Sequence, residues 1–127
     1  VANDGVWKEP YLVERIQVGG RTTYQADSRD SRRLMSSETA RVLRELMRNN
    51  VQSYYGDEHF AGFTVCAKSG TAEVGGNKKP NALFAGFVTD EGYPLAFLVT
   101  IEDGGYGRQI CIPVLEKVLT ACRESIG

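Results

Sequence analysis

Three strand-like segments joined by short connections most constrain how this chain of 127 residues can fold. They cover residues 63–71, 81–89 and 94–102, and each is rich in β-branched and aromatic residues. Only residues 90–93 join the last two segments. That length suits a hairpin, whereas a parallel pairing needs a crossover of about a dozen residues or more. The pattern therefore predicts an antiparallel sheet.

The third segment is apolar on both faces of its predicted pleat. One face carries Leu95, Phe97 and Val99, and the other carries Ala96, Leu98 and Thr100. A strand that is apolar on both faces is typical of the middle of a sheet, where both faces are covered. We therefore expect residues 94–102 to form the central strand.

An amphipathic helix is predicted before the strands, beginning after Ser36, whose hydroxyl suits an N-cap position. Its apolar residues recur at helical spacing and are Leu43, Leu46, Met47 and Val51. Asn49 and Asn50 are expected to end the helix. We interpret the apolar stripe as a contact with the core.

A second helix is predicted at the C-terminal end, over residues 108–123. Its apolar stripe at helical spacing consists of Ile110, Val114, Val118 and Ala121. Pro113 must lie in the first turn or kink the helix, because a proline further inside removes a backbone hydrogen bond and collides with the preceding turn. The chain is thus predicted to be an α+β domain, an antiparallel sheet of three or more strands flanked by an amphipathic helix and a C-terminal helix.

The first twenty-five residues are predicted to be extended. Residues 11–18 and 21–24 flank Gly19-Gly20 and predict a hairpin. Residues 25–33 are polar and charged without periodicity, which predicts a connecting loop. The basic cluster of this loop comprises Arg29, Arg32 and Arg33, interleaved with Asp27 and Asp30. Such mixed charge indicates a solvated segment.

Composition and charge exclude several functional classes. Fifteen Lys and Arg residues against sixteen Asp and Glu residues give a net charge of −1, so no nucleic-acid partner is predicted. No apolar run reaches the roughly 20 residues that span a bilayer. The three cysteines, Cys66, Cys111 and Cys122, and the single histidine, His59, lack the spacing of metal ligands. We therefore expect buried free thiols, no metal site and no cofactor.

Two different motifs overlap in residues 62–73. With Gly62 in front, the run G-x-x-x-x-A-K-S differs by one residue from the phosphate-binding loop G-x-x-x-x-G-K-[ST]. A phosphate loop needs flexible residues and a helix directly after the lysine. Residues 63–66 are strand formers instead, and three glycines between residues 70 and 76 disfavour an immediate helix. Nucleotide binding is therefore a minor alternative, which ATP or GTP binding would reveal.

The second motif is Lys68-Ser69-Gly70, which resembles the K-T-G motif of the penicillin-recognising serine enzymes. It closes a predicted strand and continues as Thr71-Ala72-Glu73, after which come an apolar strand, a hairpin, two glycines and a helix containing proline. The start, Ala2-Asn3-Asp4-Gly5, is similar to the family's A-N-G-G segment, although Asp4 replaces a glycine. Over nearly its whole length the chain resembles the C-terminal half of the transpeptidase domain of class B penicillin-binding proteins, which cross-link peptidoglycan.

The resemblance implies a role for each residue of this motif. Lys68, Ser69 and Gly70 are the expected catalytic residues. The lysine places a positive charge near the nucleophile and the substrate carboxylate, the serine offers a hydroxyl, and the glycine lets a peptide approach the strand closely. Thr71 and Ala72 are expected to bind substrate, with the Thr71 backbone N–H as an oxyanion-hole donor. The implied ligands are a peptidoglycan stem peptide and β-lactams.

Strand geometry adds a constraint of its own. Lys68 and Thr71 are three positions apart, so their side chains point to opposite faces of a strand. One ligand can contact both residues only along the edge. We therefore expect residues 68–72 to form an edge of the sheet, to which the substrate peptide adds as a further strand.

Two motifs that the family uses upstream do not occur in these 127 residues. The nucleophile lies in S-x-x-K and a second motif is S-x-N. No serine here is followed by lysine three positions later, and no S-x-N is present. We therefore expect residues 1–127 to be the C-terminal portion of a single transpeptidase domain, a fragment that is inactive alone. The missing N-terminal part would be its protein partner, and an exposed apolar surface would also allow a dimer.

The resemblance also implies a location at the extracytoplasmic face of the bacterial cell membrane, with an N-terminal anchoring helix that is not in this chain. The alternative function is a non-catalytic β-lactam sensor or interaction scaffold of the same fold. The presence or absence of S-x-x-K and S-x-N upstream distinguishes the enzyme from the non-catalytic protein, because a serine-type D-alanyl-D-alanine transpeptidase needs both motifs.

Overall fold

The structure, a computed structural model, describes residues 1–27 and 31–126. The chain divides into two compact units, one formed by Val1 with residues 3–41 and the other by Ala2 with residues 42–127. Each unit pairs its own strands. The first contains two separate antiparallel pairs, and the second contains a three-stranded sheet.

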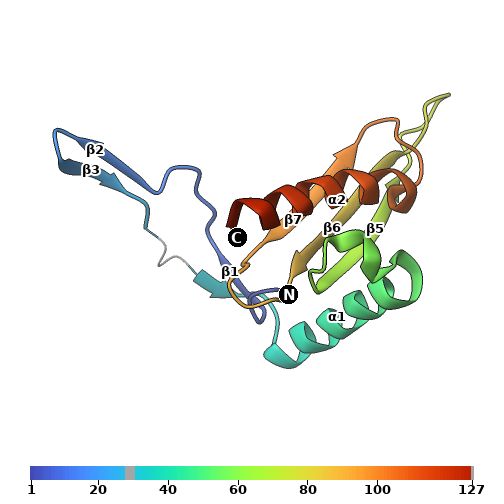
Figure 1. Ribbon diagram of the computed structural model, residues 1–127, viewed down its shortest axis with the longest axis horizontal. Coiled ribbons are helices and arrows are strands. Elements are labelled where there is room, and N and C mark those ends of the chain that lie inside the picture. The colour runs from blue at the N-terminus through green and yellow to red at the C-terminus, as the bar shows by residue number, and fades with distance from the viewer. Residues whose placement is uncertain (28–30, 127) are drawn as a thin grey trace. The chain divides into compact units, whose positions relative to one another are not determined.

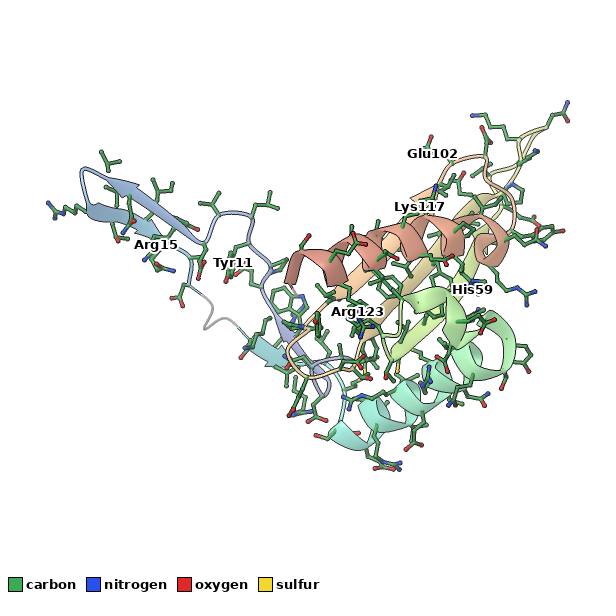
Figure 2. All side chains as sticks on the ribbon, viewed as in Figure 1. Tyr11, Arg15, His59, Glu102, Lys117 and Arg123 are labelled. Carbon is green, nitrogen blue, oxygen red and sulfur yellow. The ribbon has the colours of Figure 1, made fainter. Side chains whose placement is uncertain are left out.

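The predicted N-terminal hairpin is confirmed. Strands β2 (Arg15–Val18) and β3 (Arg21–Gln25) pair antiparallel through the Gly19-Gly20 turn, seen in Figure 1. Both turn glycines have a positive backbone φ, 55° for Gly19 and 78° for Gly20. Residues other than glycine rarely adopt this conformation. Every residue of the two strands is exposed, including Arg15, which Figure 2 labels on this hairpin.

The predicted connecting loop over residues 25–33 is wrong at both ends, because Gln25 belongs to β3 and residues 31–33 form a further strand. Strand β4 (Ser31–Arg33) pairs antiparallel with β1 (Val6–Lys8). The register sets Trp7 opposite Arg32, and the guanidinium of Arg32 lies 5.3 Å from the centre of the Trp7 ring. This cation–π contact favours pairing of a segment that has no strand-like pattern of its own. Arg29 and Asp30 lie outside the described residues.

Helix α1 (Ser37–Asn50) begins as predicted, because the Ser36 hydroxyl accepts the Thr39 backbone N–H at 3.1 Å. The helix gives way after Asn50 to a π-helical turn, η1 (Val51–Tyr55), and then to a 3-10 turn, η2 (Asp57–Phe60). The prediction of a continuous core stripe is wrong at Leu46, which is 57% exposed, whereas Val51 is fully buried.

The predicted antiparallel sheet is confirmed, but its predicted centre is wrong. Strands β5 (Val65–Ala72), β6 (Asn81–Val88) and β7 (Ala96–Ile101) are arranged in the order β5-β6-β7. Among the described residues the last strand is therefore an edge, and β6 is central. The apolar pattern does not mark a central strand here, because one face of β7 packs on the core while Leu98 on the other face is 67% exposed.

Helix α2 (Gly107–Ile126) packs on one face of this sheet, as Figure 1 shows. The buried residues of the helix are Cys111, Ile112, Leu115 and Leu119. The stripe that identified the helix in the sequence, which begins with Ile110, Val114 and Val118, is exposed instead. Pro113 is the seventh residue of α2, so it lies beyond the first turn.

The rotation of α2 on the sheet is fixed at its two ends. A Cβ on Gly107 would collide with the carbonyl oxygens of Gly70 and Leu83, so only glycine lets the helix start so close to the strands. Near the other end lies Arg123, labelled in Figure 2. It donates a hydrogen bond to the Ala61 carbonyl oxygen, and its guanidinium lies 5.1 Å from the centre of the Phe63 ring. These contacts turn residues 111, 112, 115 and 119 toward the sheet.

The core between α2 and the sheet is aromatic. Phe84 of β6 lies at its centre, stacked on Phe60 and Phe97 with ring centroids 6.3 and 6.1 Å apart. The predicted burial of free thiols is confirmed for Cys66 and Cys111, whose thiol pKa values are raised by burial, and Cys122 is half-buried. In the part of the chain that the structure describes, no helix is both long and apolar enough to cross a bilayer.

Candidate functional site

The motif strand β5 lies at an edge of the sheet, so the predicted edge position of residues 68–72 is confirmed. Among the described residues β5 pairs only with β6. In an antiparallel ladder every second residue of an edge strand directs its N–H and C=O away from the partner strand. Side chains outside the sheet bond the outward carbonyl oxygens of Val65 and Ala67 and the outward N–H of Ser69. Thr71 shares their orientation, because it is two residues further along.

The first half of this edge is covered by side chains from α1. Arg48 Nη1 donates to the Val65 carbonyl oxygen at 3.1 Å, and Asn50 Nδ2 donates to that of Ala67 at 3.4 Å. Arg48 also holds the Asp57 carboxylate through two hydrogen bonds of 2.5 and 2.6 Å. These bonds raise the pKa of Arg48 and lower that of Asp57, so both groups stay charged at neutral pH. The first half of β5 is thus anchored and closed.

Ser69, the middle residue of the motif, is held by Tyr55. The Ser69 N–H donates to the Tyr55 hydroxyl oxygen at 3.0 Å, and the Tyr55 hydroxyl donates to Ser69 Oγ at 3.0 Å. Tyr55 is 9% exposed, and its ring meets the Phe84 ring edge-on, with centroids 5.1 Å apart. Tyr55 was not predicted from the sequence, because residues 54–57 have no periodicity and a tyrosine in such a segment carries no signal of its contact.

Lys68 reaches the same edge from the opposite face of the strand. Its side chain is exposed, and its ammonium nitrogen lies 2.5 Å from the Ser69 carbonyl oxygen and 3.5 Å from Ser69 Oγ. The Ser69 carbonyl points outward from the ladder, so the ammonium group lies along the strand edge. A positive charge and a hydroxyl therefore meet at one point.

The second half of the edge is open. Thr71 and Ala72 are exposed, and within residues 1–27 and 31–126 nothing bonds the outward N–H of Thr71. A Cβ on Gly70 would lie 3.3 Å from Leu83 Cβ, a tight contact that a small shift relieves, so packing alone does not demand glycine here. All five predicted site residues thus lie consecutively on this edge strand, from Lys68 to Ala72.

This arrangement can bind an extended chain that carries an anion. The open Thr71 N–H can donate to a carbonyl oxygen of an added strand, while the ammonium and hydroxyl can donate to a carboxylate. The same segment is a strand, with no helix after the lysine as a phosphate loop would require. The geometry therefore favours peptide binding over nucleotide binding.

Residues 1–120 match the family model described as the penicillin binding protein transpeptidase domain. The peptidoglycan D,D-transpeptidase PbpA of Mycolicibacterium smegmatis is 33% identical over 109 residues, which are 83% of this chain and 22% of the relative.

Solved structures agree with this match. The D,D-transpeptidase domain of a peptidoglycan glycosyltransferase from Eggerthella lenta superposes with a TM-score of 0.80 at 28% identity, over 98% of this chain and 30% of that one. Penicillin-binding protein A from M. tuberculosis, solved as a ceftriaxone acyl-enzyme complex, gives a TM-score of 0.76 at 27% identity, over 94% and 29%. The chain therefore spans less than a third of each of these relatives, and the predicted α+β fold is confirmed.

Proposed function

This chain belongs to the penicillin-binding protein transpeptidase domain family, and we propose that it provides the substrate-binding edge of a peptidoglycan D-alanyl-D-alanine transpeptidase. The observation that carries the proposal is the open half of β5. There the Lys68 ammonium, the Ser69 hydroxyl and the Thr71 N–H line one uncovered strand edge.

In this mechanism the stem peptide adds to β5 as an antiparallel strand beside Gly70 and Thr71. Lys68 and Ser69 bind its terminal carboxylate. A serine outside these 127 residues attacks the carbonyl carbon of the penultimate D-alanine and gives up its hydroxyl proton. The amide C–N bond breaks, the terminal D-alanine leaves with a proton on its amine, and an acyl-serine ester forms. The Thr71 N–H donates to the carbonyl oxygen as negative charge develops on it. An amine of a second stem peptide then attacks the ester and forms the cross-link.

A β-lactam follows the same first step. The serine attacks the ring carbonyl, the ring C–N bond opens, and the acyl-serine persists because the leaving amine stays attached to the ligand. Support comes from the M. tuberculosis relative, which was solved as a ceftriaxone acyl-enzyme. Since S-x-x-K and S-x-N are absent from the 127 residues, this chain alone provides no nucleophile and is inactive by itself.

The partner in this proposal is the remaining, nucleophile-bearing part of the same domain. Two apolar surfaces of the second unit are available to it, the β7 face that carries Leu98 and the exposed stripe of α2. In isolation the same surfaces would support a dimer. Because peptidoglycan lies outside the cytoplasmic membrane, the proposed location is the extracytoplasmic face, with an anchor outside this chain.

A fluorescent penicillin tests the proposal. The full-length protein that carries S-x-x-K ahead of this chain should be labelled covalently, and the 127-residue chain should not. Labelling of the 127-residue chain would contradict the placement of the nucleophile. A full-length protein that is labelled but releases no D-alanine from a stem peptide and forms no cross-link would identify a β-lactam sensor instead. A full-length protein that is not labelled at all would overturn the enzymatic assignment.

A further inference from the structure

Two hydrogen-bond donors converge on the Ser69 hydroxyl. The Tyr55 hydroxyl lies 3.0 Å from Ser69 Oγ, and the Lys68 ammonium lies 3.5 Å from it. The Tyr55 oxygen is itself engaged, because it accepts the Ser69 backbone N–H at 3.0 Å. Tyr55 and Ser69 thus form a closed pair of hydrogen bonds.

The direction of each bond follows from what each group can do. A backbone N–H and an ammonium can only donate, whereas a hydroxyl has one proton and two lone pairs. Tyr55 accepts from the Ser69 N–H and therefore has its own proton free for Ser69 Oγ. With Tyr55 and Lys68 donating to both lone pairs of Ser69 Oγ, the Ser69 proton is left to point elsewhere.

We propose that Tyr55 is a positioning residue that keeps the Ser69 hydroxyl a hydrogen-bond donor, so that the β5 edge selects ligands presenting a carboxylate at this point. The inference rests on the proposed function, in which Ser69 contacts the carboxylate of the stem peptide or β-lactam. The inference adds Tyr55, a residue outside the motif, and assigns it a role: it makes Ser69 the donor and the ligand carboxylate the acceptor of their hydrogen bond.

The surroundings of Tyr55 suit this task. Its ring is buried against Phe84, and it ends the π-helical turn η1, which the Gly56 N–H closes onto the Val51 carbonyl oxygen at 2.9 Å. A rigid ring delivers the hydroxyl to a fixed point with little loss of side-chain entropy. The neighbouring Tyr54 is 64% exposed and offers a matched control that changes the same atoms.

Tyr55 also limits where a ligand strand can pair. It occupies the outward N–H of Ser69, just as Arg48 and Asn50 occupy the outward carbonyls of Val65 and Ala67. Within the exposed half of β5, from Lys68 to Ala72, the first outward N–H open to a ligand is therefore that of Thr71. Removing the Tyr55 hydroxyl exposes one more donor and frees the Ser69 hydroxyl to rotate.

The test uses the full-length protein with benzylpenicillin and with its methyl ester, which lacks the carboxylate charge. Tyr55→Phe should lower the second-order rate constant of acylation by benzylpenicillin about 10-fold, because a charge-assisted hydrogen bond is weakened. The loss should lie in the affinity of the complex that precedes acylation. Acylation by the methyl ester should change less than about 2-fold, and Tyr54→Phe should alter neither rate.

A Ser69→Ala background completes the experiment. If Tyr55 acts through the Ser69 hydroxyl, Tyr55→Phe should have little further effect on acylation by benzylpenicillin there. If Tyr55→Phe lowered the acylation rate constants of benzylpenicillin and its methyl ester equally, Tyr55 would be only structural and the proposal would be overturned. No loss for either ligand would also overturn it. Failure of the proposed function is distinguishable, because the wild-type protein would then not be acylated.

A measurement on the wild-type protein removes dependence on how the variant folds. The Tyr55 hydroxyl proton should give a protected NMR signal with a nuclear Overhauser contact to the Ser69 β protons. A hydroxyl proton that exchanges as fast as that of Tyr54 would overturn the proposal, whatever the variants show.

Discussion

The two halves of β5 share one partner strand but have opposite surroundings. Val65, Cys66 and Ala67 are at most 1% exposed, and α1 side chains bond the outward carbonyls of this half. The half from Lys68 to Ala72 is exposed or half-buried, and its outward Thr71 N–H is open. The difference shows how an edge strand can be left open for a ligand: one half anchors the strand in the protein, and the other half keeps its edge uncovered.

The largest expected effect is a loss of stability from a substitution in the anchored half of β5. Val65→Ala removes two buried methyl groups and leaves a cavity, so we expect a loss of about 3 kcal/mol in the free energy of unfolding. Thr71→Ala, on the same face of the open half, should cost less than about 0.5 kcal/mol. Urea denaturation of both variants measures the contrast, and equal losses would show that the two halves do not differ.

The next largest effect is a loss of acylation from a substitution in the open half of β5. Lys68→Ala should reduce acylation of the full-length protein by penicillin about 30-fold, or ~2 kcal/mol, because a charge-assisted hydrogen bond to the ligand carboxylate is lost. The free energy of unfolding should stay nearly unchanged, since the side chain is exposed. Lys78→Ala, another exposed lysine, is the control. Unchanged acylation in Lys68→Ala would remove this lysine from the site.

Matched glycine substitutions sharpen the comparison. Gly86 lies opposite Ala67, and a Cβ there would come within 2.6 Å of Phe97 Cζ and 2.9 Å of Ala67 Cβ, so Gly86→Ala should cost about 2 kcal/mol of stability. Gly70→Ala meets only the 3.3 Å contact with Leu83 and should cost less than about 1 kcal/mol. Thermal denaturation compares them, and a larger loss in Gly70→Ala would contradict this account of the packing.

The smallest effect is a pH dependence of the anchor. Hydrogen bonds from Arg48 lower the pKa of Asp57 below its unfolded value, near 4, so this pair stabilises the protein above that pH and the contribution is lost as pH falls through the folded pKa. Because the Asp57 side chain is 47% exposed, solvent screening limits the contribution to less than about 1 kcal/mol.

Asp57→Asn removes this contribution. The variant should be less stable than the wild type at pH 7, and the two should converge below about pH 4, as urea denaturation across pH can show. Glu91→Gln, in the connection between β6 and β7, is the control. A difference in stability that stays constant down to pH 2 would mean that the charge of Asp57 does not anchor the strand.

The sequence predicted much of the fold, because its strongest signals are local. The hairpin turn, the Ser36 cap and the three strand segments each follow from residues adjacent in the chain. Predictions failed where a residue's surroundings depend on distant partners. Leu98 has the same apolar character whether or not its face is covered, and β4 forms through a contact between Trp7 and Arg32 that no local pattern encodes.

The candidate site shows the same division. The motif placed Lys68, Ser69 and Thr71 on one strand, and their alternation predicted an edge, which the sheet order confirms. The roles of these residues remain predictions. Tyr55 could not be found from the sequence, since its contact with Ser69 spans fourteen residues through a π-helical turn.

The sequence by itself therefore determined which segments are strands and helices and which short run carries the chemistry, because backbone propensity and side-chain type act over a few residues. Only the tertiary structure decided which strand lies in the centre, which stripe of α2 is buried, and which half of β5 is open. Those outcomes depend on close packing between distant residues, such as Gly107 against the β5–β6 pair and Arg48 against Val65, and adjacent residues do not encode them.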